Sequence, residues 1–206
     1  MSIASYSDLQ TSVASWLARS DLTSTIPDFV TLFETEANRK LRVRQMMVTQ
    51  STTPSSGQFS LPSDYLSWVK VTWTGSPKRE LQYIHPYQLA EEYGTSPAGL
   101  PVKFTVQGST DGLGIVNIMP TDTSAINFTY YQKLTALSTS NTANWLLTAH
   151  PDAYLFGSLT EACVFVKDFE TAAIWKTRRD ALLEEIAMLD QKTRGPSAIS
   201  VPGRNP

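Results

Sequence analysis

Residues 51–57, STTPSSG, decide the fold, because the hydrophobic pattern of the chain changes its period on either side of them. Clustered Ser, Thr, Pro and Gly between patterned segments are typical of a turn-rich linker. Before this linker, apolar residues recur at helical spacing, and after it they alternate as in strands. The linker therefore predicts a boundary between a helical region and a β-rich region.

Two helices are predicted before the linker. Ser5 followed by Asp8 resembles a capping box at the start of the first helix. Pro27 and Asp28 form the first turn of the second, where a fixed φ and a negative charge are both favourable. The apolar stripes of the two helices are Leu9, Val13, Trp16 and Leu17, then Val30, Phe33, Ala37 and Leu41.

After the linker, β-branched and aromatic residues alternate in several short segments, which predicts strands. Two of the segments flank the turn sequence GSTDG and should pair as a hairpin. Pro86 opens one short helix that continues to Glu92. We expect a small, mostly antiparallel sheet from residues 59–61, 65–74, 81–84, 102–107, 113–119 and 126–130.

Helical spacing returns at His150, where Pro151 and Asp152 suit the first turn of a helix. Asp168 is a candidate cap between this helix and a last one, which should end at residues 195–196. The order of elements predicts an α+β protein with segregated layers, in which both helical ends form one bundle around an inserted β-domain. The predicted parts are helices over 1–50, the β-rich domain over 51–144, helices over 145–194, and an extended tail over 195–206.

Composition excludes several classes of protein. The 206 residues carry a net charge of −2, whereas a general nucleic-acid binder is strongly basic. A single cysteine, Cys163, permits no intramolecular disulfide, and two histidines add too few ligands for a zinc site. No apolar run reaches the roughly 18 residues of a membrane span. The N-terminal MSIASYSDLQ lacks the pattern of a secretory signal.

Catalytic motifs are absent from the sequence. There is no G-x-S-x-G elbow and no phosphate-binding G-x-x-x-x-G-K-[ST] loop. Cys163 lies on the apolar side of a predicted helix, so we expect a buried, inert thiol. His85 and His150 each precede a proline and are interpreted as the first residues of helices. We therefore predict a protein that is not an enzyme and needs no cofactor and no metal.

Two alternatives stay open at this stage. A cell-wall hydrolase would need a pair of carboxylates in a cleft, and Glu161 with Asp168 or Asp152 is the candidate pair. A DNA-binding accessory protein would use the basic cluster, which we define as Arg39, Lys40, Arg42 and Arg44.

The basic cluster lies in the last turns of the second predicted helix, where cations complement the helix dipole. The same side chains would also suit carboxylates of a neighbouring subunit or the phosphates of passing DNA. Of the five tryptophans, Trp16 and Trp175 are expected in the core. At least one of Trp68, Trp73 and Trp145 is a candidate interface anchor, since aromatic residues are enriched in interfaces.

Six stretches of the sequence, in chain order, carry a family resemblance. They are residues 6–22, 26–46, LPSDYL at 61–66, GLP at 99–101 with MP at 119–120, 130–147, and PDAYLFGSLTEA at 151–162 continuing to Asp168, Glu170 and Trp175. Together they resemble the head-to-tail adaptor (head-completion or connector) proteins of tailed bacteriophages, podophage type.

The resemblance implies a structural virion protein at the neck, assembled in the host cytoplasm. It implies a ring of twelve copies that docks on the portal protein, extends the DNA channel and offers a platform to the next tail or nozzle protein. Genomic DNA would pass without specific binding, and no membrane, cofactor or catalysis is implied. The basic cluster would then face a neighbouring subunit or the channel.

The tail after residue 194 has a pattern of its own. Residues 198–201, AISV, alternate in a way that suits addition of a strand to the sheet edge of another chain. We therefore expect the tail to contact the portal or a neighbouring subunit, through Ile199, Val201, Pro202 and Arg204.

Overall fold

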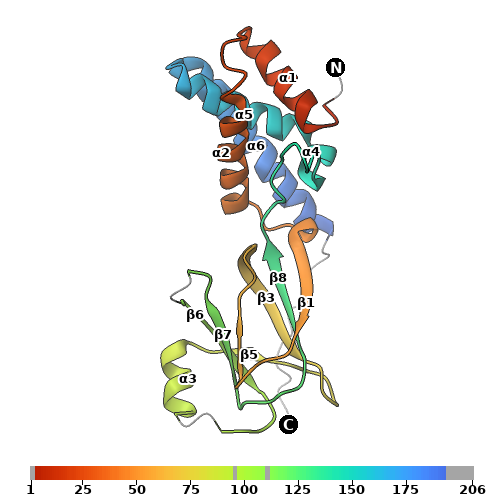
Figure 1. The fold of residues 1–206 in the computed structure, drawn as a ribbon, viewed down its shortest axis with the longest axis vertical. Helices are drawn as coiled ribbons and strands as arrows, with labels where there is room; N and C mark the ends of the chain where they lie inside the picture. The colour runs from red at the N-terminus through yellow and green to blue at the C-terminus, as the bar shows by residue number, and fades with distance from the viewer. Residues whose placement is uncertain (1–2, 95–96, 110–111, 194–206) are drawn as a thin grey trace, which may run out of the picture. The chain divides into compact units, whose positions relative to one another are not determined.

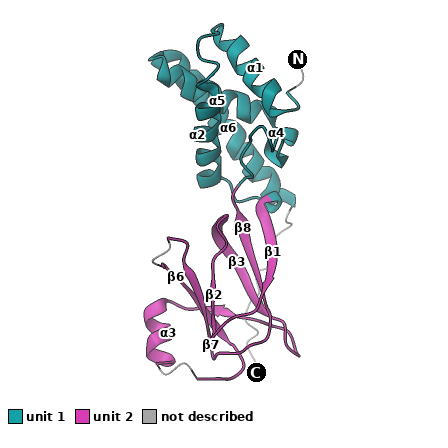
Figure 2. Cartoon of the chain, in the orientation of Figure 1, with its two compact units in different colours: residues 1–45, 134–206 teal, residues 46–133 magenta. Residues whose placement is uncertain are grey.

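The computed structural model describes residues 3–94, 97–109 and 112–193. Helices and strands follow in the order two helices, a β-rich stretch with one short helix, and three helices (Figure 1). The chain divides into two compact units, residues 1–45 with 134–206 and residues 46–133 (Figure 2). This is the α+β class that the sequence predicts.

Unit 1 is helical and is built from both ends of the chain (Figure 2). Ser5 caps the first helix as predicted: its hydroxyl accepts from the Asp8 amide at 3.2 Å, and the Asp8 carboxylate accepts from the Ser5 amide at 3.1 Å. The helices are α1 (Tyr6–Leu17), α2 (Ile26–Lys40), α4 (Trp145–Ala149), α5 (Pro151–Phe165) and α6 (Phe169–Thr193).

Helix α5 is the centre of unit 1, since it packs against α1, α2, α4 and α6. Nine of its fifteen residues are buried, and they point in all directions around the helix. On the side of α2, Gly157 lets the helices approach so closely that a Cβ there would lie 2.0 Å from the Phe33 ring. The four residues of the predicted stripe of α2, Val30, Phe33, Ala37 and Leu41, are all buried.

Unit 2 contains two four-stranded sheets, most of whose strands are labelled in Figure 1. Its apolar core includes Val71, Phe104, Ile118 and Phe128. The first sheet is antiparallel, in the order β1 (Met47–Thr52), β8 (Ile126–Gln132), β3 (Tyr65–Trp73) and β4 (Arg79–Glu80). The second is β2 (Gln58–Ser60), β7 (Ile115–Met119), β6 (Lys103–Gln107) and β5 (Gln82–Tyr83), with β5 and β6 parallel. The short helix α3 (Pro86–Glu92) and the β6–β7 hairpin lie where the sequence predicts them.

Two sheets rather than one are the main correction to the predicted β-region. The predicted strand over 81–84 is reduced to β5, which belongs to the second sheet, while β4, just before it in the chain, belongs to the first. Leu81 lies between them and is buried, with its amide donating to the carbonyl of Val71. The chain thus changes sheets at this buried residue.

Strand β1 also differs from the prediction, because it begins at Met47 inside the stretch assigned to helices. Its sequence, MVTQST, has no apolar alternation, since the strand lies at the edge of its sheet and four of its six residues are exposed. The periodicity that marks a half-buried strand is therefore missing.

Trp16 was expected in the core, and this expectation is wrong. Its side chain is 54% exposed in the last turn of α1. The ring instead packs on the surface, 6.1 Å from the ring of Phe156 and 5.5 Å from that of Trp175.

Substitution of Gly157 by alanine tests the packing of α5 on α2. The added Cβ would overlap the fully buried Phe33 ring, and overpacking of this kind typically costs about 1–3 kcal/mol. We expect a lower free energy of unfolding in urea. The control is Gly108→Ala, where a Cβ meets nothing within 4 Å. Equal stability of the two variants would contradict the close packing.

Candidate functional site

An ion-pair network connects α2, α5 and α6. Its centre is Arg179, whose side chain is almost completely buried. The guanidinium lies 2.6 Å from Glu36 and 3.6 Å from Glu161, while Lys40 lies 2.9 Å from Glu36 and 2.7 Å from Asp180. Because a buried guanidinium is costly without partners, the carboxylates fix the position of α6 against the other two helices.

Arg44 makes a second connection to α6. Its Nε donates to Asp190 at 2.8 Å, its backbone amide donates to the same carboxylate at 3.1 Å, and its Nη2 donates to Thr193 at 2.8 Å. Asp190 is buried, so this contact ties the segment after α2 to the end of α6. Arg42 closes α2 by donating to the carbonyls of Asn38 and Leu41.

The basic cluster is therefore divided between two environments. Lys40, Arg42 and Arg44 have partners inside unit 1, as expected of cations at a helix C-terminus. Arg39 is exposed, and within the described residues it has no ion pair or hydrogen bond. A role of these residues toward a neighbouring subunit or DNA stays a prediction. The tail residues Ile199, Val201, Pro202 and Arg204 lie outside the described residues.

Glu34 forms a buried polar centre that the sequence did not indicate. One carboxylate oxygen accepts from the Leu137 amide and from the Tyr154 hydroxyl, both at 2.9 Å. The Tyr154 oxygen accepts in turn from the side-chain amide of Asn144 at 2.6 Å. The side-chain oxygen of Asn38 accepts from the backbone amide of Leu134 at 2.8 Å. These bonds hold the chain that returns from unit 2 onto α2 and α5.

Burial is the main influence on the titration of this centre. It raises the pKa of Glu34, although the two donated hydrogen bonds act in the opposite direction. It also raises the pKa of Tyr154, as does the neighbouring Glu34 carboxylate. The pair is thus a structural contact held away from solvent and offers no accessible acid or base.

The residues of the hydrolase alternative are not assembled into a pair. Glu161 lies beside Arg179, and Asp168 caps α6 by accepting from the Thr171 amide at 3.2 Å. Asp152 lies in the first turn of α5, nine residues before Glu161, which is about 13 Å along a helix. Cys163 is buried, and burial raises the pKa of its thiol. Nothing in this arrangement favours hydrolysis.

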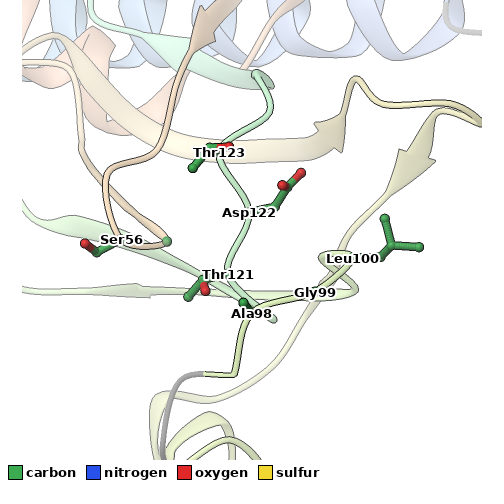
Figure 3. Close-up of a pocket in the computed structure, with 8 residues that line it drawn as sticks. Ser56, Ala98, Gly99, Leu100, Thr121, Asp122 and Thr123 are labelled. Atoms are coloured by element: carbon green, nitrogen blue, oxygen red, sulfur yellow. The ribbon is translucent and has the colours of Figure 1, made fainter.

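An open hollow of about 490 Å³ lies on unit 2 (Figure 3). Asp122 is the one ionisable residue among its described lining residues, and its carboxylate accepts from the Trp73 indole at 2.6 Å. Hydrogen bonds from Ser124 and then Trp73 lower the pKa of Asp122. The hollow therefore contains no acid–base pair. Within the described residues, no three His, Cys, Asp or Glu side chains cluster as a metal site, and no helix has the length and apolarity to cross a membrane.

Exposed aromatic side chains are the more informative surface feature. On unit 1, exposed Trp16 clusters with the half-buried rings of Phe156 and Trp175, and the guanidinium of Arg178 lies 5.6 Å from the Trp175 ring. On unit 2, Trp68 is 37% exposed and stacks on Tyr83 at 5.2 Å. Of the three tryptophans named as interface candidates, Trp68 is exposed and Trp73 is buried. Each unit thus carries exposed aromatic side chains.

A comparison with protein-family models matches residues 4–202 to the family described as SU10 adaptor protein. A search of curated proteins found no match to this chain.

Replacing Arg179 tests the ion-pair network. Arg179→Ala leaves the Glu161 carboxylate without its cation and Glu36 with Lys40 alone, and loss of one partner of a buried pair costs about 3 kcal/mol. We expect that loss in urea unfolding. The control Arg178→Ala removes an adjacent, exposed arginine that only stacks on rings, worth about 0.5–1 kcal/mol. Equal losses in both variants would show that the buried network contributes no more than a surface contact.

Replacing Glu34 tests the buried polar centre. Glu34→Ala leaves two buried donors unsatisfied, at about 1–3 kcal/mol each, whereas Glu34→Gln keeps a carbonyl acceptor. Because the pKa of Glu34 is raised in the folded state, protonation of its carboxylate contributes to the free energy of unfolding. This contribution is complete below the ordinary glutamate pKa of about 4.3 and is lost as the pH rises through the raised value. Unfolding measured from acidic to neutral pH should show wild type losing stability relative to Glu34→Gln. A difference that does not change with pH would contradict the prediction.

Proposed function

This chain belongs to the SU10 adaptor protein family, and from that premise we propose that it forms a ring of twelve copies. The proposed ring lies beneath the portal of a short-tailed bacteriophage. Membership makes the protein a structural adaptor of a phage that associates with other virion proteins. In our proposal the ring extends the DNA channel at the neck and provides the attachment platform for the next tail or nozzle protein. Copies are made in the host cytoplasm and join the particle during assembly.

The family match over residues 4–202 carries this proposal, because it covers both units of the chain. The construction of the chain supports it. A closed ring needs two different faces on each copy, since neighbouring subunits meet head to tail. A helical unit and a β-unit with separate cores supply two such faces. Both carry exposed aromatic side chains of the kind that anchor interfaces.

Charge supports a passive role toward DNA. A net charge of −2 gives no general attraction for phosphates, so the genome would move past the ring without being held. In the basic cluster, three residues already have partners within unit 1, and Arg39 is exposed. We propose that Arg39 donates to a neighbouring subunit or faces the channel. We also propose that the tail contacts the portal or a neighbouring copy.

Light scattering on the purified chain, alone and mixed with the cognate portal ring, tests the function. We expect the portal to gain the mass of twelve copies, and a truncation before residue 195 to reduce that binding. Arg39→Glu should weaken assembly more than Lys176→Glu, which changes an exposed cation outside the cluster. If light scattering shows no binding of the chain to the portal ring, the proposed function is wrong.

A further inference from the structure

The open side of unit 2 has the features of a site for an added strand. β1 and β2 are edge strands of different sheets, and both are labelled in Figure 2. Within the described residues, the backbone of β1 pairs only with β8, and that of β2 pairs with β7. The outer side of β1 therefore presents unpaired amides and carbonyls, whereas on β2 the Gln58 amide and carbonyl bond back to Ser55.

The β1 edge lacks the usual protection against pairing. Edge strands are normally short, charged, bulged or interrupted by proline. β1 is six residues long, uncharged and free of proline, and its register with β8 runs without a shift. The opposite edge of the same sheet, β4, has two residues and both are charged. The contrast indicates that β1 is kept open for a partner.

A small hollow with a mixed polar and apolar lining lies between β1 and β2. It has a volume of about 70 Å³. Gln50 and Thr52 of β1 line it, together with Phe59 of β2 and Phe128 of β8. The two phenylalanine rings lie 5.5 Å apart. Strand addition gains affinity from backbone bonds and specificity from pockets for alternate side chains, and both elements are present here.

We propose that this edge binds residues 197–201 of a second copy of the chain. Thirteen residues follow the last described turn of α6, and none of residues 195–203 is charged, which matches the uncharged edges. Pro196 and Pro202 bracket a five-residue segment, about the length of β1. In an extended segment Ile199 and Val201 share one face, and that face would meet the hollow.

A second copy is the occupant because the interaction is heterologous. Each copy has one donor segment and one acceptor edge, so every copy in a ring can both give and receive a strand. This inference rests on the proposed ring. It adds that the acceptor of the tail is the β1 edge of the neighbouring copy, and that the β-unit is incomplete without that neighbour.

Disulfide trapping tests the contact in the full chain. Neighbouring strands lie about 4.8 Å apart, within reach of a disulfide, and Ser51 and Ser200 would both lie on the face away from the hollow. Chains carrying Ser51→Cys and chains carrying Ser200→Cys are mixed, assembled on the portal ring and oxidised. We expect a disulfide-linked dimer. The matched control replaces the acceptor with Ser63→Cys, an exposed serine of unit 2 outside both edges, and should give no dimer.

The outcomes separate this inference from the proposed function. Portal binding with no dimer overturns the strand addition and leaves the adaptor function standing, whereas no portal binding overturns both. A chain carrying both cysteines that links only within itself would show that its own tail occupies the edge, which also overturns the inference.

A charge introduced on the β1 edge provides an independent test. Gln50→Lys places a cation on β1 and should abolish both the linked dimer and closure of the ring. Gln82→Lys makes the same change on exposed β5, at the far edge of the other sheet, and should leave both intact. Equal behaviour of the two variants would count against the β1 edge as acceptor.

Discussion

The burial of α5 is the constraint on which the rest of unit 1 depends. A helix with buried residues on all sides must be surrounded, and the surrounding helices come from both ends of the chain. Gly157 brings α2 close, and Phe33 and Tyr154 fill the contact with rings 5.0 Å apart. Apolar packing alone is tolerant of sliding, so polar contacts set the register. Glu34 and Arg179 do this on two sides of the bundle.

Periodicity and capping signals predicted the elements whose pattern is set by residues close together in the chain. The capping box at Ser5, the stripe of α2, helix α3 and the β6–β7 hairpin needed only local information. Strand β1 was missed because an exposed edge has no apolar alternation to detect. The division of the β-region into two sheets was missed because Leu81 looks the same within a strand as it does at the crossing between sheets.

The polar contacts could not be predicted for a different reason. Glu34 finds its partners, and Arg179 its nearest carboxylate, Glu36, more than a hundred residues away in the chain, so no local pattern marks them. In sequence, Glu34 and Glu36 are two ordinary helical acids. In the structure one is buried against a tyrosine and the other pairs with Lys40 and Arg179. Trp16 was wrongly placed in the core for another reason. Helical spacing identifies an apolar face of a helix but does not show whether another element covers it.

The insertion of unit 2 into unit 1 has a mechanical consequence. The chain crosses between the units twice, near residues 45–46 and 133–134, and the two crossings are neighbours because Met47 pairs with Tyr131. The Lys133 amide also donates to the Asp64 carbonyl at 2.7 Å. A force that draws the units apart is thus shared by two covalent strands hydrogen-bonded side by side. In each copy of the proposed ring, neither strand would carry the whole load.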